Sequence, residues 1–499
     1  MRKTRSDSAI VGVLAIASLL ATLLQTLTIP IIPRLPSLLD ASPTDASWVV
    51  TSTLLTGAIT TPVSGRLGDL YGKRRVLLLT MSAVVVGTVI SACTSSLWPM
   101  VIGRALQGVA VGVIPLALGL VRDQLPPERV GGAITLMSAT LGLGGAAGIP
   151  LAGAVAENFD WHLLFWGSAG LSLLCTIWLA VAVPESPSRA PGRFDIVGTI
   201  GLTVGLALLL LPIVNGAQWG WGDARTVGLG ATAVVVLLGW GRHQLRTAAP
   251  VVDLRVTARR PVLMANLATV ATGFAIFAMF FVFPQILQAP RSTGYGFGQS
   301  LVASGLALLP NGLVALLLTP LAARMITRHG PRKAMILAAL LIGAGYVYVL
   351  LRRDSVGDII GASGVIGAGA GVSAAATAKL ITDAVPVTET ASANGVNALM
   401  RSLGSATGSA LLAVILAHAA VHVGPASLPS ESGLRTAFLV GAGAAVVSLV
   451  CAVLVPRVRS GSTVATEHDV PARTEGVGVS AASAVSPSAS SIPGDGPKT

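Results

Sequence analysis

Apolar runs of about 20 residues, separated by short polar connectors, repeat along almost the whole chain. A helix of about 20 apolar residues crosses the roughly 30 Å hydrocarbon core of a bilayer, so each run predicts a membrane-spanning helix. The pattern predicts fourteen, near residues 10–32, 48–66, 76–95, 99–121, 131–155, 163–183, 195–214, 226–241, 261–287, 299–323, 333–351, 357–381, 392–421 and 434–455.

Composition agrees with this pattern. The chain has 499 residues, of which 53% are hydrophobic and 11% charged, whereas about a quarter of a soluble domain is charged. The alternating segments of a membrane β-barrel are not seen, so the predicted fold class is an all-α polytopic membrane protein. Residues 456–499 are rich in Ser, Gly, Pro and Ala, and we expect them to form a disordered cytoplasmic tail.

The distribution of basic residues predicts the orientation. Fourteen crossings put both termini on one side, and 25 of the 33 Lys and Arg residues fall on that side, against six on the other. The positive-inside rule therefore places both termini in the cytoplasm of a multi-pass plasma-membrane protein of a bacterial-type cell. The formal net charge of +12 is scattered over connectors and forms no patch, so no nucleic-acid partner is expected.

An internal repeat divides the chain into two halves. "GRLGDLYGKRRV" (65–76) has an echo in "AARMITRHGPRKAM" (322–335), in which Gly72 matches Gly330 and Arg74 matches Arg332. Duplicated halves are typical of transporters with a pathway between them. The predicted organisation is a cytoplasmic N-terminus at 1–9, a six-helix half at 10–183, a linker at 184–260 with two extra helices (195–214 and 226–241), and a six-helix half at 261–455 before the tail at 456–499.

The stretch "GRLGDLYGKRR" resembles the signature after the second helix of the major facilitator superfamily, and fourteen helices resemble its EmrB/QacA-type drug:proton antiporter branch. The resemblance covers residues 10–455. It implies a latch in which Asp69 accepts hydrogen bonds from the helix that begins near Ser392 in the other half. The latch residues are Gly65, Gly68 and Gly72, which allow a sharp turn and close approach, Asp69, and Lys73, Arg74 and Arg75, which hold the loop in the cytoplasm. The alternative is a plain positive-inside loop.

Two further segments resemble signatures of the same family. "IGRALQGVAVG" (102–112) implies proton coupling by Arg104 and Gln107, the alternative being an Arg that extends to the interface. "GGAAGIPLAGAV" (144–155) implies the helix 5 motif of antiporters, although ordinary close packing explains the same residues. Its members are Gly144, Gly148, Pro150 and Gly153, with Pro150 expected to kink the helix.

Polar and aromatic side chains inside the runs are candidates for a substrate cavity. Gln25 stands where this branch usually carries an Asp, and an amide cannot carry a proton at neutral pH. The cavity candidates are Gln25, Asn266, Phe277, Phe281, Asn311 and Asn397. For Arg401, anchoring at the interface and a role in the site are equally supported. Asp123 is interpreted as an ion-pair or capping residue of a loop.

The function expected from these features is export of lipophilic, drug-like or antibiotic-like organic compounds by proton antiport with alternating access. Two alternatives stay open: an uncoupled facilitator or importer of a small metabolite, and a lipid-handling membrane protein. No enzyme is expected, because no nucleophile–base set or phosphate loop fits its context. We expect no metal and no cofactor other than the proton gradient, and a monomer whose partners are a small lipophilic substrate and the lipid bilayer.

Overall fold

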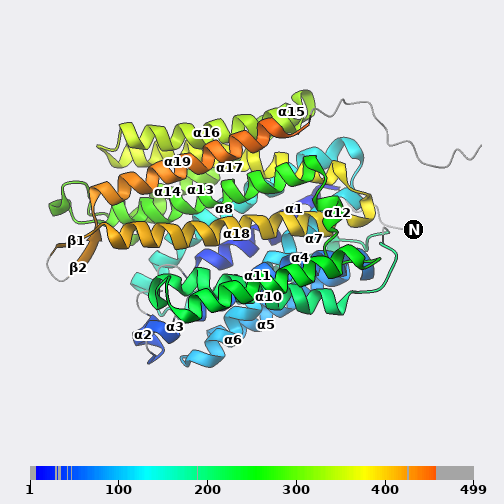
Figure 1. Ribbon diagram of the computed structural model, residues 1–499, viewed down its shortest axis with the longest axis horizontal. Helices are drawn as coiled ribbons and strands as arrows, with labels where there is room; N and C mark the ends of the chain where they lie inside the picture. Colours follow the sequence, from blue (N-terminus) through cyan, green and yellow to red (C-terminus); the bar gives the residue numbers. More distant parts are fainter. Residues whose placement is uncertain are drawn as a thin grey trace, which may run out of the picture. The chain divides into compact units, whose positions relative to one another are not determined.

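The computed structural model describes residues 7–28, 31, 35–41, 43–46, 48–187, 189–423 and 426–456. Long helices run side by side through this part of the chain (Figure 1). One antiparallel hairpin of β1 (Ala420–Val423) and β2 (Ala426–Pro429) follows α18, with Ala420 opposite Pro429. The tail predicted to be disordered lies outside the described residues after Pro456, as do residues 1–6 of the predicted N-terminal segment.

The first half of the chain contains six long helical units, one of which is interrupted by a 3-10 turn. The elements are α1 (Asp7–Thr26), α2 (Leu35–Leu38), α3 (Pro43–Ala46), α4 (Trp48–Tyr71), α5 (Lys73–Ala92), α6 (Leu97–Gly108), η2 (Val109–Gly112), α7 (Val113–Gln124), α8 (Pro127–Asn158) and α9 (His162–Ala182). The second predicted helix was expected to end at residue 66, but α4 continues to Tyr71. Gly65, Gly68 and Asp69 therefore lie on a helix, and the connector begins at Gly72.

The remainder contains two central helices and a second helical half. The elements are α10 (Ile196–Trp219), α11 (Ala224–Arg246), α12 (Leu254–Thr257), α13 (Arg260–Gln288), η3 (Arg291–Thr293), α14 (Leu301–Leu317), α15 (Thr319–His329), α16 (Pro331–Leu351), α17 (Val356–Ala384), η4 (Val387–Glu389), α18 (Thr390–His418) and α19 (Glu431–Leu454). Side-chain caps start several of them: Asp195 accepts from the Gly198 amide at α10, and Ser355 and Asp358 form a capping box at α17.

Twelve of the described helices are long and apolar enough to cross a membrane. A thirteenth candidate is the pair α14 and α15, which bends by 46°. The helix α14 continues through Pro310, and the break falls at Leu318. The helix α4 has 24 residues and is not one of these candidates, because its composition is more polar.

The turn after the second helix of each half has the same geometry, which supports the repeat. Gly72 has φ +110° and Gly330 has φ +83°, backbone conformations that residues other than glycine rarely adopt. Two residues later, Arg74 donates to the Ala180 carbonyl at 2.7 Å and Arg332 donates to the Val453 carbonyl at 2.7 Å. Both carbonyls lie at the end of the last helix of their half, so the two halves close their helix bundles in the same way.

The halves meet most extensively along two helix pairs. The helix α8 packs along α14, and α4 packs along α18. A Cβ on Gly312 of α14 would lie 2.7 Å from the Gly142 carbonyl of α8, so these backbones approach closely. The central helix α10 packs against α4 and α18 through Leu202, Leu206 and Leu210, while α11 contacts mainly α10 (Figure 1).

Candidate functional site

A buried cluster of charges lies where α4 meets the first turn of α18. Asp69 is at 0% exposure and accepts a hydrogen bond from the Ser392 backbone N–H at 2.8 Å. Lys73 contacts Asp69 at 3.4 Å and Asp123 at 2.8 Å, and all three side chains are at 0% exposure. The carboxylate of Asp69 thus bonds to a helix N-terminus, where the helix dipole favours an anion. This contact between the two halves is the one that the sequence predicts.

Two glycines of the predicted latch make this geometry accessible. A Cβ on Gly65 would lie 2.6 Å from the Ala391 carbonyl, so only glycine allows α4 and α18 to approach this closely. Gly72, with its positive φ, turns the chain from α4 into α5. Gly68 lies on α4 against Leu116 of α7, inside the first half.

Lys73 is buried. The resemblance implied that it holds the loop in the cytoplasm together with Arg74 and Arg75, and the structure places it in the protein interior between two carboxylates. Arg74 bonds inside the first half, while Arg75 is 66% exposed and pairs with Glu185 at 3.5 Å. A buried ammonium ion is stable only when it is paired, and Asp69 and Asp123 supply that pairing.

The role of Asp123 was predicted in part. It was interpreted as an ion-pair or capping residue of a loop; it does form an ion pair, but it lies in the last turn of α7 inside the cluster, where it accepts from both Lys73 and the Ser186 hydroxyl. Asp123 is 50 residues from Lys73, and no local pattern indicates that they meet. The spacing of Asp69 and Lys73, four residues apart, was the one available signal.

Arg104 is also buried, at 2% exposure, but neutral groups surround it. It donates to Gln107 at 2.6 Å and to the Leu24 carbonyl of α1 at 3.3 Å. Gln107 in turn donates to Ser91 of α5 at 2.9 Å. The two residues therefore share one face of α6, and no described carboxylate pairs with Arg104. Gln25, the neighbour of Leu24, is half-buried.

The helix 5 segment lies between the two halves. Gly144 and Gly148 of α8 face Thr22 and Thr26 of α1, so the glycines permit close packing within the first half. Pro150, on α8, faces Gly305 of α14, where a Cβ would lie 2.8 Å from the proline nitrogen. Gly153 is buried on the same helix. The helix α8 is continuous through Pro150 and ends at Asn158.

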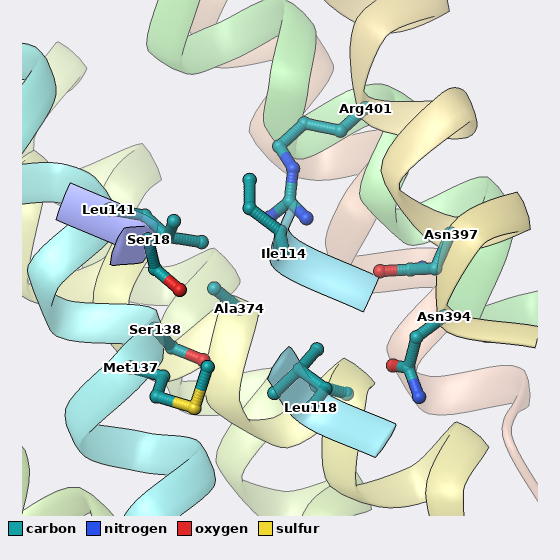
Figure 2. Close-up of a pocket in the computed structure, with 11 residues that line it drawn as sticks. Ser18, Ile114, Leu118, Met137, Ser138, Leu141, Ala374, Asn394, Asn397 and Arg401 are labelled. Carbon is teal, nitrogen blue, oxygen red and sulfur yellow. The ribbon is translucent and has the colours of Figure 1, made fainter. Parts of the chain in front are cut away.

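A central cavity of about 10 Å³ lies between the halves, with walls from α1, α7, α8, α17 and α18 (Figure 2). This volume holds roughly one water molecule, so the halves are closed around it. The lining residues are Ser18, Ile114, Leu118, Met137, Ser138, Leu141, Ala374, Ala378, Asn394, Asn397 and Arg401.

The structure brings few of the predicted cavity residues to this place. Asn397 lines the cavity, and its side-chain N–H group donates a hydrogen bond to the side-chain oxygen of Asn266 at 3.0 Å. Asn311 instead bonds to the Ser363 carbonyl at 3.3 Å within the second half. Phe277 and Phe281 stack at 5.9 Å and pack against the core of the second half.

Most of the other lining residues were identified only from the structure, although the spacing of polar residues in the sequence offered one signal. Asn394, Asn397 and Arg401 lie at positions i, i+3 and i+7 of α18 and so share a face. Among the described residues, no cluster of three metal-ligating side chains occurs. His418 and His422 are four residues apart in the sequence but do not lie on one helix, because His418 ends α18 and His422 lies in β1.

Comparisons with known proteins agree with this architecture. A family model described as Major Facilitator Superfamily matches residues 14–318 and 267–487. The chain is 27% identical to the tetracenomycin C resistance and export protein of Streptomyces glaucescens over 389 residues, which are 77% of this chain and 71% of that protein. It is 29% identical to the cephamycin export protein CmcT of Amycolatopsis lactamdurans over 436 residues, which are 85% and 87% of the two chains.

A multidrug resistance protein B homolog of Mycobacterium tuberculosis is 25% identical over 448 residues, covering 87% of this chain and 81% of that protein. Among solved structures, the human organic anion transporter MFSD10 matches with a TM-score of 0.61 at 16% identity, covering 90% of this chain and 99% of that one. The proton:xylose symporter XylE matches with a TM-score of 0.60 at 14% identity, covering 88% and 94%. These structural matches concern the fold.

Proposed function

The chain belongs to the major facilitator superfamily, and we propose that it exports lipophilic, antibiotic-like organic compounds in exchange for protons. The two halves alternate between states open to opposite sides of the membrane. The observation that carries this proposal is the cavity whose walls come from both halves, together with the contact between the halves that Asp69 makes with the Ser392 amide. Two relatives are named as export proteins, one for tetracenomycin C and one for cephamycin, and these names support the direction and the class of compound.

We propose fourteen membrane spans with both termini in the cytoplasm. Counting α14 and α15 as one span makes thirteen, and the 24-residue helix α4 is the fourteenth. At 1.5 Å per residue α4 is long enough to cross a hydrocarbon core. Its Thr, Ser and Gly residues lower its hydropathy, and they are buried against α6 and α18 rather than exposed to lipid. The 25-to-6 distribution of basic residues supports the orientation.

The latch role follows from the same contact. When the halves separate at this end, Asp69 loses the Ser392 amide but keeps Lys73, because Lys73 belongs to its own half. The cluster therefore favours the closed arrangement by one charge-assisted hydrogen bond. Gly65 permits this approach, and Gly72 sets the turn that brings Lys73 to Asp69.

We assign proton coupling to Arg104 and its hydrogen-bond partner Gln107. An Arg stays protonated, so it acts as a fixed charge that changes partners. Its present partners are the neutral oxygens of Gln107 and Leu24, which leaves the charge open to an acidic group of a substrate or to water. The absence of a described carboxylate beside Arg104, together with Gln25, favours one second candidate, an uncoupled facilitator.

Drug-driven proton release tests the proposal. Inverted membrane vesicles are energised to an acidic interior, and an internal pH probe is followed as neutral and charged antibiotics are added. We expect alkalinisation with at least one compound, reduced about tenfold or more in Arg104→Gln. The matched control is Arg352→Gln, since Arg352 is exposed. Thermal unfolding of each variant separates loss of coupling from loss of folding. Uptake of a compound without a gradient, with no proton movement, would assign the facilitator instead.

A further inference from the structure

Arg401 is a cation that faces the central cavity without a partner. It lies on α18, well inside a 29-residue helix, and its guanidinium group points into the space between the halves (Figure 2). No described residue pairs with its side chain in a salt bridge or accepts a hydrogen bond from it. A charged side chain inside the membrane is costly unless it is paired or faces water, and such residues mark functional sites.

No described acid balances this charge. The cavity lining contains no Asp or Glu. The buried carboxylates Asp69 and Asp123 form ion pairs with Lys73 in the cluster at the end of α4. Arg104 does not line this cavity and donates to the neutral oxygens of Gln107 and Leu24. Arg401 is therefore the cation of the cavity that is free to bind an anion.

The amide groups beside Arg401 are held with defined orientations. Thr269 donates its hydroxyl hydrogen to the Ala265 carbonyl at 2.9 Å, so its oxygen accepts from the Asn397 amide at 2.8 Å. The Asn397 carbonyl oxygen is then directed toward the cavity (Figure 2). Asn394 likewise donates to the Thr390 carbonyl at 2.9 Å, and its own side-chain oxygen has no partner. The cavity thus offers acceptors on the same helix as the cation.

The opposite wall is apolar. Ile114 and Leu118 of α7 and Leu141 and Met137 of α8 face the polar side of α18. The hydroxyls of Ser18 and Ser138 donate to carbonyls of their own helices, at 2.9 and 2.8 Å, and so supply no further donor to the cavity. One cation, amide acceptors and an aliphatic wall together match a compound with one acidic group, hydrogen-bond donors and an apolar body.

We propose that Arg401 binds the acidic group of the transported compound, and that the compounds are lipophilic organic acids with a single negative charge. The inference rests on the proposed function, whose substrate class it specifies. The cavity of about 10 Å³ is too small for such a compound in this closed arrangement. The acid binds when the halves separate around α18, and the guanidinium then donates to it in place of water.

Binding to the purified full-length protein in phosphatidylcholine nanodiscs tests the inference. The probes are 1-pyrenebutyrate, its neutral primary amide and 1-pyrenebutylamine, and the readout is fluorescence anisotropy. We expect the carboxylate to bind at least about tenfold more tightly than the amide or the amine. Arg401→Gln weakens carboxylate binding about 10- to 100-fold, the effect of removing a charged hydrogen bond, and leaves the amide unchanged. Arg401→Lys restores part of the preference, and the exposed Arg352→Gln has no effect.

Equal binding of the three probes, no binding of any of them, or a carboxylate preference that survives in Arg401→Gln would overturn the inference. Titration in nanodiscs with phosphatidylglycerol separates two sources of the acid, because competition by this lipid assigns a phospholipid and no competition assigns a soluble compound. Failure of the proposed function looks different. Carboxylate-selective binding without drug-driven proton release keeps the inference and refutes the coupling. Proton release by neutral compounds that persists in Arg401→Gln keeps the coupling and refutes the inference.

Discussion

Replacing Asp69 with Asn should open the α4–α18 junction. The carboxylate accepts from the Ser392 amide at 2.8 Å, and this bond crosses between the halves. The Lys73 contact at 3.4 Å lies within one half. Its loss changes the free energy of the closed and open arrangements equally and so does not change the equilibrium between them. What changes the equilibrium is the difference between a charged and a neutral acceptor at a helix N-terminus.

That difference is about 2 kcal/mol. A hydrogen bond to a charged group contributes about 1.5–3 kcal/mol and a neutral one about 0.5–1.5 kcal/mol. The attraction between an anion and the helix N-terminus adds about 0.3–1 kcal/mol. Because about 1.4 kcal/mol is a factor of ten, the open-to-closed ratio should rise about 30-fold in Asp69→Asn.

Pulsed electron paramagnetic resonance measures this ratio directly. Spin labels are placed at Tyr71, at the end of α4, and at Val387, just before α18, which are 53% and 40% exposed. The background lacks the native Cys93, Cys175 and Cys451. We expect a short distance in the unsubstituted protein and a large added population at longer distance in Asp69→Asn.

The matched control is Asp123→Asn. It removes the same charge from the same Lys73, but among the described residues Asp123 forms no hydrogen bond or ion pair with α18, so the distance distribution should shift much less. An unchanged distribution in Asp69→Asn, or an equal shift in the two variants, would refute the latch reasoning.

Two further predictions concern stability. Lys73→Met should destabilise the protein by about 3–5 kcal/mol, because breaking a buried pair leaves its carboxylates uncompensated. The control Arg75→Met, at an exposed residue, should cost about 1 kcal/mol or less. Thermal unfolding followed by Trp fluorescence compares the two variants, and equal losses of stability would contradict the importance of the cluster. In the connector between α8 and α9, the backbone N–H and then the ring of His162 bond to Asp160 and hold the pKa of that carboxyl below its ordinary value of 3.8. The Asp160 contribution to stability is therefore complete above pH 3.8 and disappears as the pH falls through the lowered pKa, so the Tm difference between the unsubstituted protein and Asp160→Asn should shrink toward zero in acid; a constant difference would refute it.

The helices were predictable because their signal is local. A run of apolar residues must be about 20 long to cross a bilayer, whatever it packs against. The turn after the second helix was also readable, since Gly72 and Gly330 carry a conformation that other residues avoid. The ends of the helices were less predictable: α1 ends at Thr26 instead of residue 32, and α4 ends at Tyr71 instead of residue 66. The polar residues of α4 are buried by neighbouring helices, which a local pattern does not show.

The partners of the charged residues were not predictable in the same way. Asp69 was placed correctly because its motif resembles a family signature, and the Ser392 amide lies where that resemblance implies. Lys73 has the same motif, yet its burial depends on Asp123, which arrives from another helix. The aromatic pair Phe277 and Phe281 formed a plausible wall in sequence, but α13 turns it toward the core of the second half.

The apolar helices, the repeat and the family therefore follow from features that are local in the chain. The position of the cavity does not, because it depends on which faces of α1, α7, α8, α17 and α18 meet. Arg401 shows the difference most clearly. Its sequence context fits an interface anchor as well as a site residue, and its role depends on the missing counter-charge, which is a property of all the helices packed around it.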